Sequence, residues 1–255
     1  LFFVPWTLVW AWMLPLPASV QSQLEEALEY GFEGVIVYVD QAGHPPASYA
    51  AGWHDRDQQI PAYPQALFKL ASIGKLYEAV AVTKLVQAGR LSLEGTLAEY
   101  FPQLAGRIEH ADRITLRMLV RHRSGLPNLT DTPGFWTDPP QSSQAALERV
   151  LDRPADFMPG EAYAYSNTNY LLISELIKQV TGDKAAYFQA AIFAPLGLSH
   201  TYLSIHEIDL GELMSGYYIG VEEDIKTADY GSMVATAADV GVFLRALNDG
   251  SLLTP

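Results

Sequence analysis

A serine and a lysine lie three residues apart at the start of an apolar segment, and this pair constrains the chain more than any other feature. A helix that begins at Ser72 places the side chains of Ser72 and Lys75 on one face. A serine hydroxyl becomes a nucleophile when a neighbouring base takes its proton, and a lysine can be that base if burial lowers its pKa. The pattern predicts a nucleophilic site at a helix N-terminus, where backbone N–H groups also favour an oxyanion. This spacing is common on solvated helix faces, so a second motif is needed.

The residues after Lys75 predict a buried helix. Ala79–Val82 is wholly apolar, which indicates burial on several sides, and Gly89 is a natural end for the helix. Burial of this kind would also desolvate the lysine near the helix start.

A second polar stretch, Tyr163–Tyr170, precedes another strong helical pattern. We expect Tyr165 and Asn167 on the loop that enters this helix, where extended backbone points residues two apart the same way. A tyrosine can relay a proton, and an asparagine amide can hold a substrate carbonyl. The alternative is that Asn167 or Thr168 only caps the helix and that the tyrosines are ordinary aromatics at the edge of the core.

Composition limits the remaining possibilities. A chain of 255 residues with 49% hydrophobic content can bury one substantial core, and one large domain is the simplest organisation. The net charge of -13 argues against nucleic-acid or anionic-membrane partners, which select basic patches. Without cysteine there is no disulfide or thiolate metal site. His200, His206, Glu207 and Asp209 crowd together but lack zinc-ligand spacing, so we expect surface polar groups and no metal.

Short strands and helices are predicted elsewhere, which gives an α+β chain. The β-branched run 34–39 and the segment 47–53 predict a hairpin, followed by loop up to Pro64. Thr236 and Asp239 resemble a capping box before a last helix. Further helices are expected at 23–30, 114–120 and 145–151, and a surface loop at 128–140.

Ser72-Ile73-Gly74-Lys75 followed by Tyr165-Ser166-Asn167 resembles the serine β-lactamase and penicillin-binding-protein family. The similarity is to its class C-like branch, which includes class C β-lactamases, D-Ala-D-Ala carboxypeptidases and β-lactamase-like esterases. It runs from about Gly34 to the end of the chain. Other similar stretches are Gly89–Leu93, His122–Pro127, Pro159–Gly160, Pro195–Leu198 and Ser232–Asp239.

The resemblance implies a helical lobe beside an antiparallel sheet and a serine hydrolase that works through an acyl-enzyme without a cofactor. Ser72 would be the nucleophile, Lys75 its activating partner, Tyr165 a proton relay to the leaving group, and Asn167 a substrate-side hydrogen-bond donor. Whether Lys75 or Tyr165 is the base stays open. The substrate would be a β-lactam, a D-Ala-D-Ala peptide derived from peptidoglycan, or an ester. The alternative is a non-catalytic ligand- or cell-wall-binding protein that keeps the fold.

One family feature is missing from the sequence. Family members carry a third motif, Lys or His, then Ser or Thr, then Gly, on a strand that lines the site. Lys226-Thr227-Ala228 comes too early in the chain and lies in an acidic, loop-like context. We therefore expect residues 23–255 to be one hydrolase domain truncated before the third motif, with an unpaired sheet edge and an exposed apolar face.

The first residues predict an export signal. The chain is uncharged through Gln23, and an apolar run ends in Pro15-Leu16-Pro17-Ala18-Ser19. This resembles the later part of a secretory signal, so residues 1–22 are expected to be a partial export signal, with Val20-Gln21-Ser22 as the candidate cleavage site. The predicted location is periplasmic or extracellular. A membrane anchor and a packed N-terminal arm are the alternatives.

Overall fold

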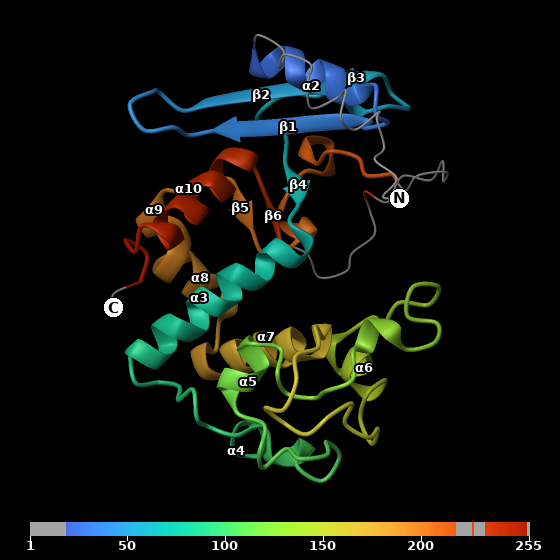
Figure 1. Ribbon diagram of the computed structural model, residues 1–255, viewed down its shortest axis with the longest axis vertical. Coiled ribbons are helices and arrows are strands. Elements are labelled where there is room, and N and C mark those ends of the chain that lie inside the picture. The colour runs from blue at the N-terminus through green and yellow to red at the C-terminus, as the bar shows by residue number, and fades with distance from the viewer. Residues whose placement is uncertain (1–18, 218–225, 227–232, 254–255) are drawn as a thin grey trace, which may run out of the picture. The chain divides into compact units, whose positions relative to one another are not determined.

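The structure is a computed structural model that describes residues 19–217, 226 and 233–253 (Figure 1). These residues form two compact units, each built from separate stretches of chain. The first unit contains residues 19–69, 200–217, 226 and 234–242, and the second contains residues 70–199, 233 and 243–253. Of the predicted export signal over 1–22, residues 1–18 lie outside the described residues.

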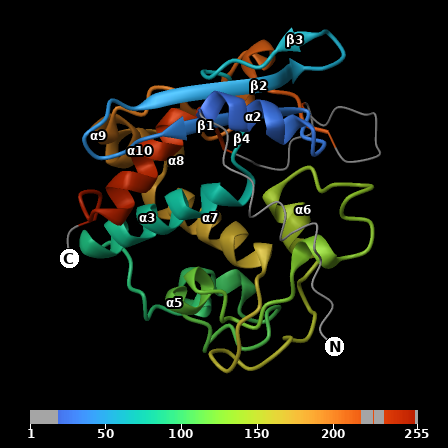
Figure 2. The ribbon, with the colours of Figure 1, turned by 45° about the horizontal axis from the view of Figure 1, so that its top comes forward.

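The first unit begins with a helix that packs on an antiparallel hairpin. Helix α2 (Val20–Leu28) contacts strand β2 (Ala47–Asp55), which pairs with β1 (Gly34–Val39), as Figure 2 shows. The helix starts earlier than predicted, because the Ser19 hydroxyl accepts a hydrogen bond from the Ser22 N–H and caps it. The prediction of loop up to Pro64 is wrong. Strand β3 (Ile60–Pro61) pairs with β2, and two residues are too short to show a strand pattern.

A second antiparallel sheet of this unit joins residues far apart in the sequence. Its strand order is β4 (Phe68–Lys69), β6 (Val234–Ala235) and β5 (Thr201–Tyr202). Beside it lie two 3-10 turns, η5 (Ile205–Glu207) and η6 (Leu210–Glu212). Leu67, Ile205, Leu213 and Val234 form a small buried cluster there.

The predicted capping box before helix α10 (Ala237–Asn248) is half right. The Thr236 hydroxyl accepts a hydrogen bond from the Asp239 N–H at 3.2 Å. The Asp239 carboxylate does not return to Thr236. It accepts instead from the His200 N–H at 2.8 Å and the Thr201 hydroxyl at 2.9 Å. The carboxylate therefore ties the helix start to the segment that enters β5.

The second unit is helical. Helix α3 (Gly74–Gln87) contacts α7 (Asn167–Thr181), and Val80, Ala81 and Val82 are buried, as their apolar run predicted. Three shorter helices also contact α7: α5 (Leu116–Val120), α6 (Ser143–Glu148) and α8 (Lys184–Phe188). The other helical segments are η1 (Ala71–Ile73), α4 (Leu97–Tyr100), η2 (Pro102–Leu104), η3 (Leu129–Asp131), the π-helical η4 (Gln189–Phe193) and α9 (Ala194–Leu196).

Together these elements give the predicted α+β class with antiparallel sheets. Over the described ranges, no helix is both long enough and apolar enough to cross a membrane.

Candidate active site

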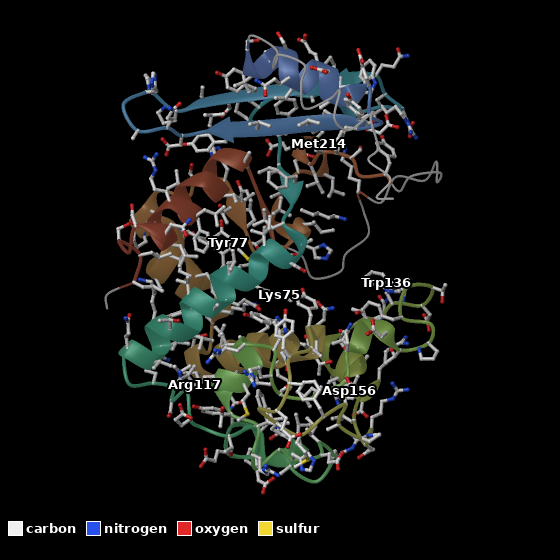
Figure 3. The ribbon with its side chains drawn as sticks, in the orientation of Figure 1. Lys75, Tyr77, Arg117, Trp136, Asp156 and Met214 are labelled. Atoms are coloured by element: carbon white, nitrogen blue, oxygen red, sulfur yellow. The ribbon has the colours of Figure 1, made fainter. Side chains whose placement is uncertain are left out.

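The predicted nucleophile lies on a short 3-10 turn directly before α3. The turn η1 contains Ser72, and Lys75 lies in the first turn of α3 (Figure 3), so the prediction of one continuous helix from Ser72 is wrong by this turn. Side chains three residues apart nearly eclipse in 3-10 geometry, which keeps the two groups together. The Lys75 Nζ donates to Ser72 Oγ at 3.1 Å. Ser72 is exposed and Lys75 is half-buried.

The residue before the serine has an uncommon backbone conformation. Ala71 has a φ of 45°, in the left-handed region that residues with a Cβ avoid. Such conformations cost about 1–2 kcal/mol and cluster at functional sites. The turn that presents Ser72 is therefore strained.

Tyr165 reaches the serine from the loop before α7. Its Oη lies 2.7 Å from Ser72 Oγ, and either oxygen can be the donor. The Lys75 Nζ lies 5.2 Å from the centroid of the Tyr165 ring and 5.8 Å from that of Tyr170, so the cation faces two aromatic rings. Burial raises the pKa of Tyr170 to about 12, and its hydroxyl donates to the Val120 carbonyl. The structure thus brings Ser72, Lys75 and Tyr165 together.

Asn167 has different contacts. Its Nδ2 donates to Asn128 Oδ1 and to Thr130 Oγ1, both at 3.2 Å. Its backbone N–H also donates to Asn128 Oδ1, at 2.9 Å, which identifies that atom as the acceptor and so fixes the orientation of both amides. Because both hydrogens of the Asn167 Nδ2 are engaged, the predicted donation to a substrate requires one of these bonds to break.

The N-terminus of α7 is capped from another segment. The alternative considered from the sequence, a cap from Asn167 or Thr168, does not match the structure. Asn128 caps the Asn167 N–H, while the Thr168 hydroxyl donates to the Pro127 carbonyl at 2.6 Å and accepts from the Leu129 N–H at 3.1 Å. No sequence signal pointed to this cap, because Asn128 lies in a polar stretch predicted as surface loop and 39 residues before its partner.

His122 also lies at this site and had no assigned role. Its ring stacks on the Tyr165 ring with centroids 4.5 Å apart and planes at 29°. The Nδ1 accepts from the Ser166 N–H at 3.2 Å and from Asn169 Nδ2 at 3.1 Å. Burial, and next the charge of Lys75, lower the pKa of His122. The resemblance of the stretch 122–127 to the family was the only sequence signal that pointed here.

The remaining candidates belong to the first unit, whereas Ser72 belongs to the second. Lys226 Nζ is 3.8 Å from the Asp55 carboxylate in the first unit, and Thr227 and Ala228 lie outside the described residues. The Glu207 and Asp209 carboxylates accept backbone N–H groups of their own turns. In the part of the chain that the structure describes, no three His, Asp or Glu side chains are grouped so as to hold a metal ion.

Ser72 lies within hydrogen-bond distance of Lys75 and Tyr165, and the chain combines helices with antiparallel sheets, as in the β-lactamase/transpeptidase-like fold. Residues 20–255 match the family model described as Beta-lactamase, and the chain belongs to this family.

Solved structures support the assignment. D-amino acid amidase from Ochrobactrum anthropi SV3, complexed with L-phenylalanine amide, is 28% identical with a TM-score of 0.79, and the match covers 91% of this chain and 70% of that one. A penicillin binding protein from Bacillus halodurans, 23% identical with a TM-score of 0.72, shares the fold over 87% of this chain and 71% of its own. The family and its structural neighbours are hydrolases of the serine β-lactamase-like superfamily.

Curated relatives match shorter parts of the chain. "Protein flp" of Staphylococcus aureus (strain N315) is 24% identical over 188 residues, which is 71% of this chain and 38% of the relative. A "Putative D-alanyl-D-alanine carboxypeptidase" of Escherichia coli (strain K12) is 29% identical over 154 residues, 57% of this chain and 36% of the relative. The chain therefore matches little more than a third of the length of these relatives.

Proposed function

We propose that this protein is a serine hydrolase that works through an acyl-enzyme on Ser72. The observation that carries the proposal is that Ser72 Oγ lies within hydrogen-bond distance of two proton-transfer groups, Lys75 Nζ at 3.1 Å and Tyr165 Oη at 2.7 Å. Covalent catalysis needs a nucleophile within hydrogen-bond distance of a base, and Ser72 meets this requirement. Lys75 is assigned the activation of Ser72, and Tyr165 the proton transfer to the leaving group.

With an amide substrate, the reaction has two stages, acylation of Ser72 and hydrolysis of the resulting ester. The amine form of Lys75 takes the Ser72 proton while Oγ bonds to the carbonyl carbon. The tetrahedral oxyanion collapses, the C–N bond breaks, and the leaving nitrogen receives that proton by way of Tyr165 Oη. Water then adds to the Ser72 ester, the ester C–O bond breaks, and Ser72 Oγ regains a proton as the acid leaves.

We propose an amide next to a D-amino acid as the substrate class. The 28% identical structure is named a D-amino acid amidase, and one relative is named a putative D-alanyl-D-alanine carboxypeptidase. β-Lactams and short-chain esters are the competing substrates, because the same acyl transfer to Ser72 would serve all three.

A turnover panel tests this proposal. The chain and its Ser72→Ala variant are assayed with D-phenylalanine amide, a D-Ala-D-Ala peptide, a chromogenic cephalosporin and a short-chain ester. We expect turnover of an amide substrate and a loss of about 10³-fold or more in Ser72→Ala, because the nucleophile is removed. Turnover unaffected by the substitution would refute the mechanism. Ligand binding without turnover by the unsubstituted chain would favour the non-catalytic binding protein.

We also propose that the protein is exported. Support comes only from the apolar composition of residues 1–22. Fractionation of cells that produce the chain tests this, and recovery solely in the cytoplasm would contradict it.

A further inference from the structure

A buried chain of hydrogen bonds ends at the His122 ring. The Leu126 N–H donates to Ser124 Oγ at 3.1 Å, the Ser124 hydroxyl donates to Asn169 Oδ1 at 2.6 Å, and Asn169 Nδ2 contacts His122 Nδ1 at 3.1 Å. Ser124 is 1% exposed, Asn169 0% and His122 9%. The Ser166 backbone N–H donates to His122 Nδ1 at 3.2 Å, so this nitrogen is an acceptor and Asn169 presents its NH₂ group to it. The Asn169 Oδ1 therefore faces Ser124, whose hydroxyl donates to it.

The assignment of donors and acceptors also fixes the tautomer of the His122 ring. Its Nδ1 accepts two N–H groups, one from Asn169 and one from the Ser166 backbone, so the proton of the neutral ring is on Nε2. Protonation of Nδ1 would break both bonds, and burial together with the Lys75 charge lowers the pKa of the ring. The titratable groups that face the ring are Lys75 from α3, Tyr163 and Tyr165 from the loop before α7, and Tyr170 from α7 itself.

The Tyr165 ring packs against the His122 ring. Its side chain is 42% exposed, and it extends from a loop that precedes α7. The His122 ring lies stacked against it at 4.5 Å, while the hydroxyl contacts Ser72. An exposed tyrosine without a packed face samples several rotamers, and small misplacements of a catalytic group reduce rates strongly.

We propose that His122 is a positioning residue for catalysis: its ring, locked by Ser166 and Asn169, holds Tyr165 at hydrogen-bond distance from Ser72. The inference rests on the proposed function, since it assigns Tyr165 a part in proton transfer. It separates two roles of one side chain, the ring that supports Tyr165 and the Nδ1 that accepts the two N–H groups.

Two substitutions remove these roles one at a time. His122→Asn places an amide oxygen near the position of Nδ1 and keeps an acceptor, but removes the ring that stacks on Tyr165. Asparagine also tolerates the φ of 53° at this position. His122→Phe keeps a ring but removes the acceptor. His110→Asn is a matched control, because His110 has a φ of 63° and lies on the loop after η2.

The readouts are the labelling rate of Ser72 by a fluorophosphonate and the melting temperature of the full chain. In labelling, the Ser72 Oγ–P bond forms, the P–F bond breaks, fluoride leaves and the serine proton passes to the base. We expect His122→Asn to label about tenfold more slowly with a melting temperature near that of the unsubstituted chain. His122→Phe should label about threefold more slowly and melt at a clearly lower temperature. The control should match the unsubstituted chain in both.

The test is that the more stable variant, His122→Asn, labels more slowly than the less stable variant, His122→Phe. If His122 had only a structural role, the less stable variant would label more slowly. Equal labelling of His122→Asn and the unsubstituted chain would overturn the inference and leave the proposed function intact. No labelling of Ser72 in the unsubstituted chain would overturn both. If His122→Asn does not fold, a tenfold or greater loss in folded His122→Phe overturns the inference. If His122→Phe does not fold, the rate of His122→Asn decides alone.

Discussion

The N-termini of the two longest helices in the second unit are built differently. At the start of α3, Ser72 is exposed on a 3-10 turn after a strained Ala71, and the N-cap residue Ile73 makes no side-chain cap hydrogen bond. At the start of α7, His122 Nδ1 and Asn128 Oδ1 accept the backbone N–H groups of Ser166 and Asn167, and the Thr168 hydroxyl accepts the Leu129 N–H, all through buried or half-buried hydrogen bonds. Thus one end presents a reactive group, and the other end is immobilised.

The reactive serine and the hydrogen bonds that fix the neighbouring loop therefore lie at two different helix N-termini. An uncapped helix N-terminus with an exposed hydroxyl gives up stability, while a satisfied polar network fixes one conformation. Tyr165 connects the two ends, because it precedes α7 in sequence and contacts Ser72 at the start of α3. Substitutions of Ser72, of the Tyr165 hydroxyl or of the ring that stacks on Tyr165 should therefore change rates, and substitutions that remove the hydrogen-bond acceptors at the start of α7 should change stability.

The largest effect is expected for Tyr165→Phe. Loss of the hydroxyl removes the 2.7 Å contact with Ser72 Oγ, so turnover of the amide substrate should fall about 10²-fold, within the range of general acid–base catalysis. Thermal melting should stay near that of the unsubstituted chain. Tyr163→Phe, on the same loop with its side chain 66% exposed, is the control and should keep its rate. A rate for Tyr165→Phe within threefold of the unsubstituted chain would place the tyrosine outside the chemistry.

Asn128→Ala tests the support at α7. It leaves the Asn167 N–H without its acceptor and should lower the free energy of unfolding by about 1–2 kcal/mol. Asn128→Asp keeps an acceptor and places a negative charge at a helix N-terminus, so it should recover most of that loss. Urea unfolding measures both variants. Equal stabilities of the two would show that the hydrogen bond to the Asn167 N–H does not stabilise the helix.

Ala71→Gly tests the strain at α3. Glycine adopts a positive φ without steric cost, so the variant should be more stable by about 1 kcal/mol. The control is Ala88→Gly, an exposed alanine with a φ of -78° at the C-cap of α3, which should lose about 0.4–1 kcal/mol because glycine makes the unfolded chain more flexible. The same urea titrations give both values, and a loss of stability in Ala71→Gly would argue against strain at the turn.

The smallest effect concerns pH. Because the pKa of His122 is lower in the folded chain than its ordinary value of 6.5, the unfolded chain binds a proton first as the pH falls. The contribution of the neutral ring to stability is therefore complete above about pH 6.5 and is lost as the pH falls through the folded pKa. Thermal melts across this range should show a smaller decrease for His122→Asn than for the unsubstituted chain. Parallel curves would contradict the lowered pKa.

The parts predicted well from sequence are local. Ser72 and Lys75 are related by spacing along one segment, and a 3-10 turn in place of a helical one did not separate them. The contact of Tyr165 with Ser72 spans 93 residues, and only the family resemblance indicated it.

The hydrogen bonds that hold the start of α7 were not predictable from the sequence, because they are tertiary contacts between short polar segments. In the sequence, Asn128 is typical of a loop, and its contact with α7 is visible only in the fold. Asn169 is a single polar residue within a helical pattern, and its contact with His122 is likewise tertiary. In the same way, β3 has two residues and acquires its conformation from pairing with β2. Periodicity carries no information about such contacts.

Trapping the acyl-enzyme tests whether Ser72 is the nucleophile. The chain is mixed with an amide or β-lactam substrate, quenched in acid and mapped by peptide mass spectrometry. We expect an acyl adduct on the peptide that carries Ser72, formed more slowly in Tyr165→Phe and absent in Ser72→Ala. An adduct on another residue, or one that persists in Ser72→Ala, would contradict it.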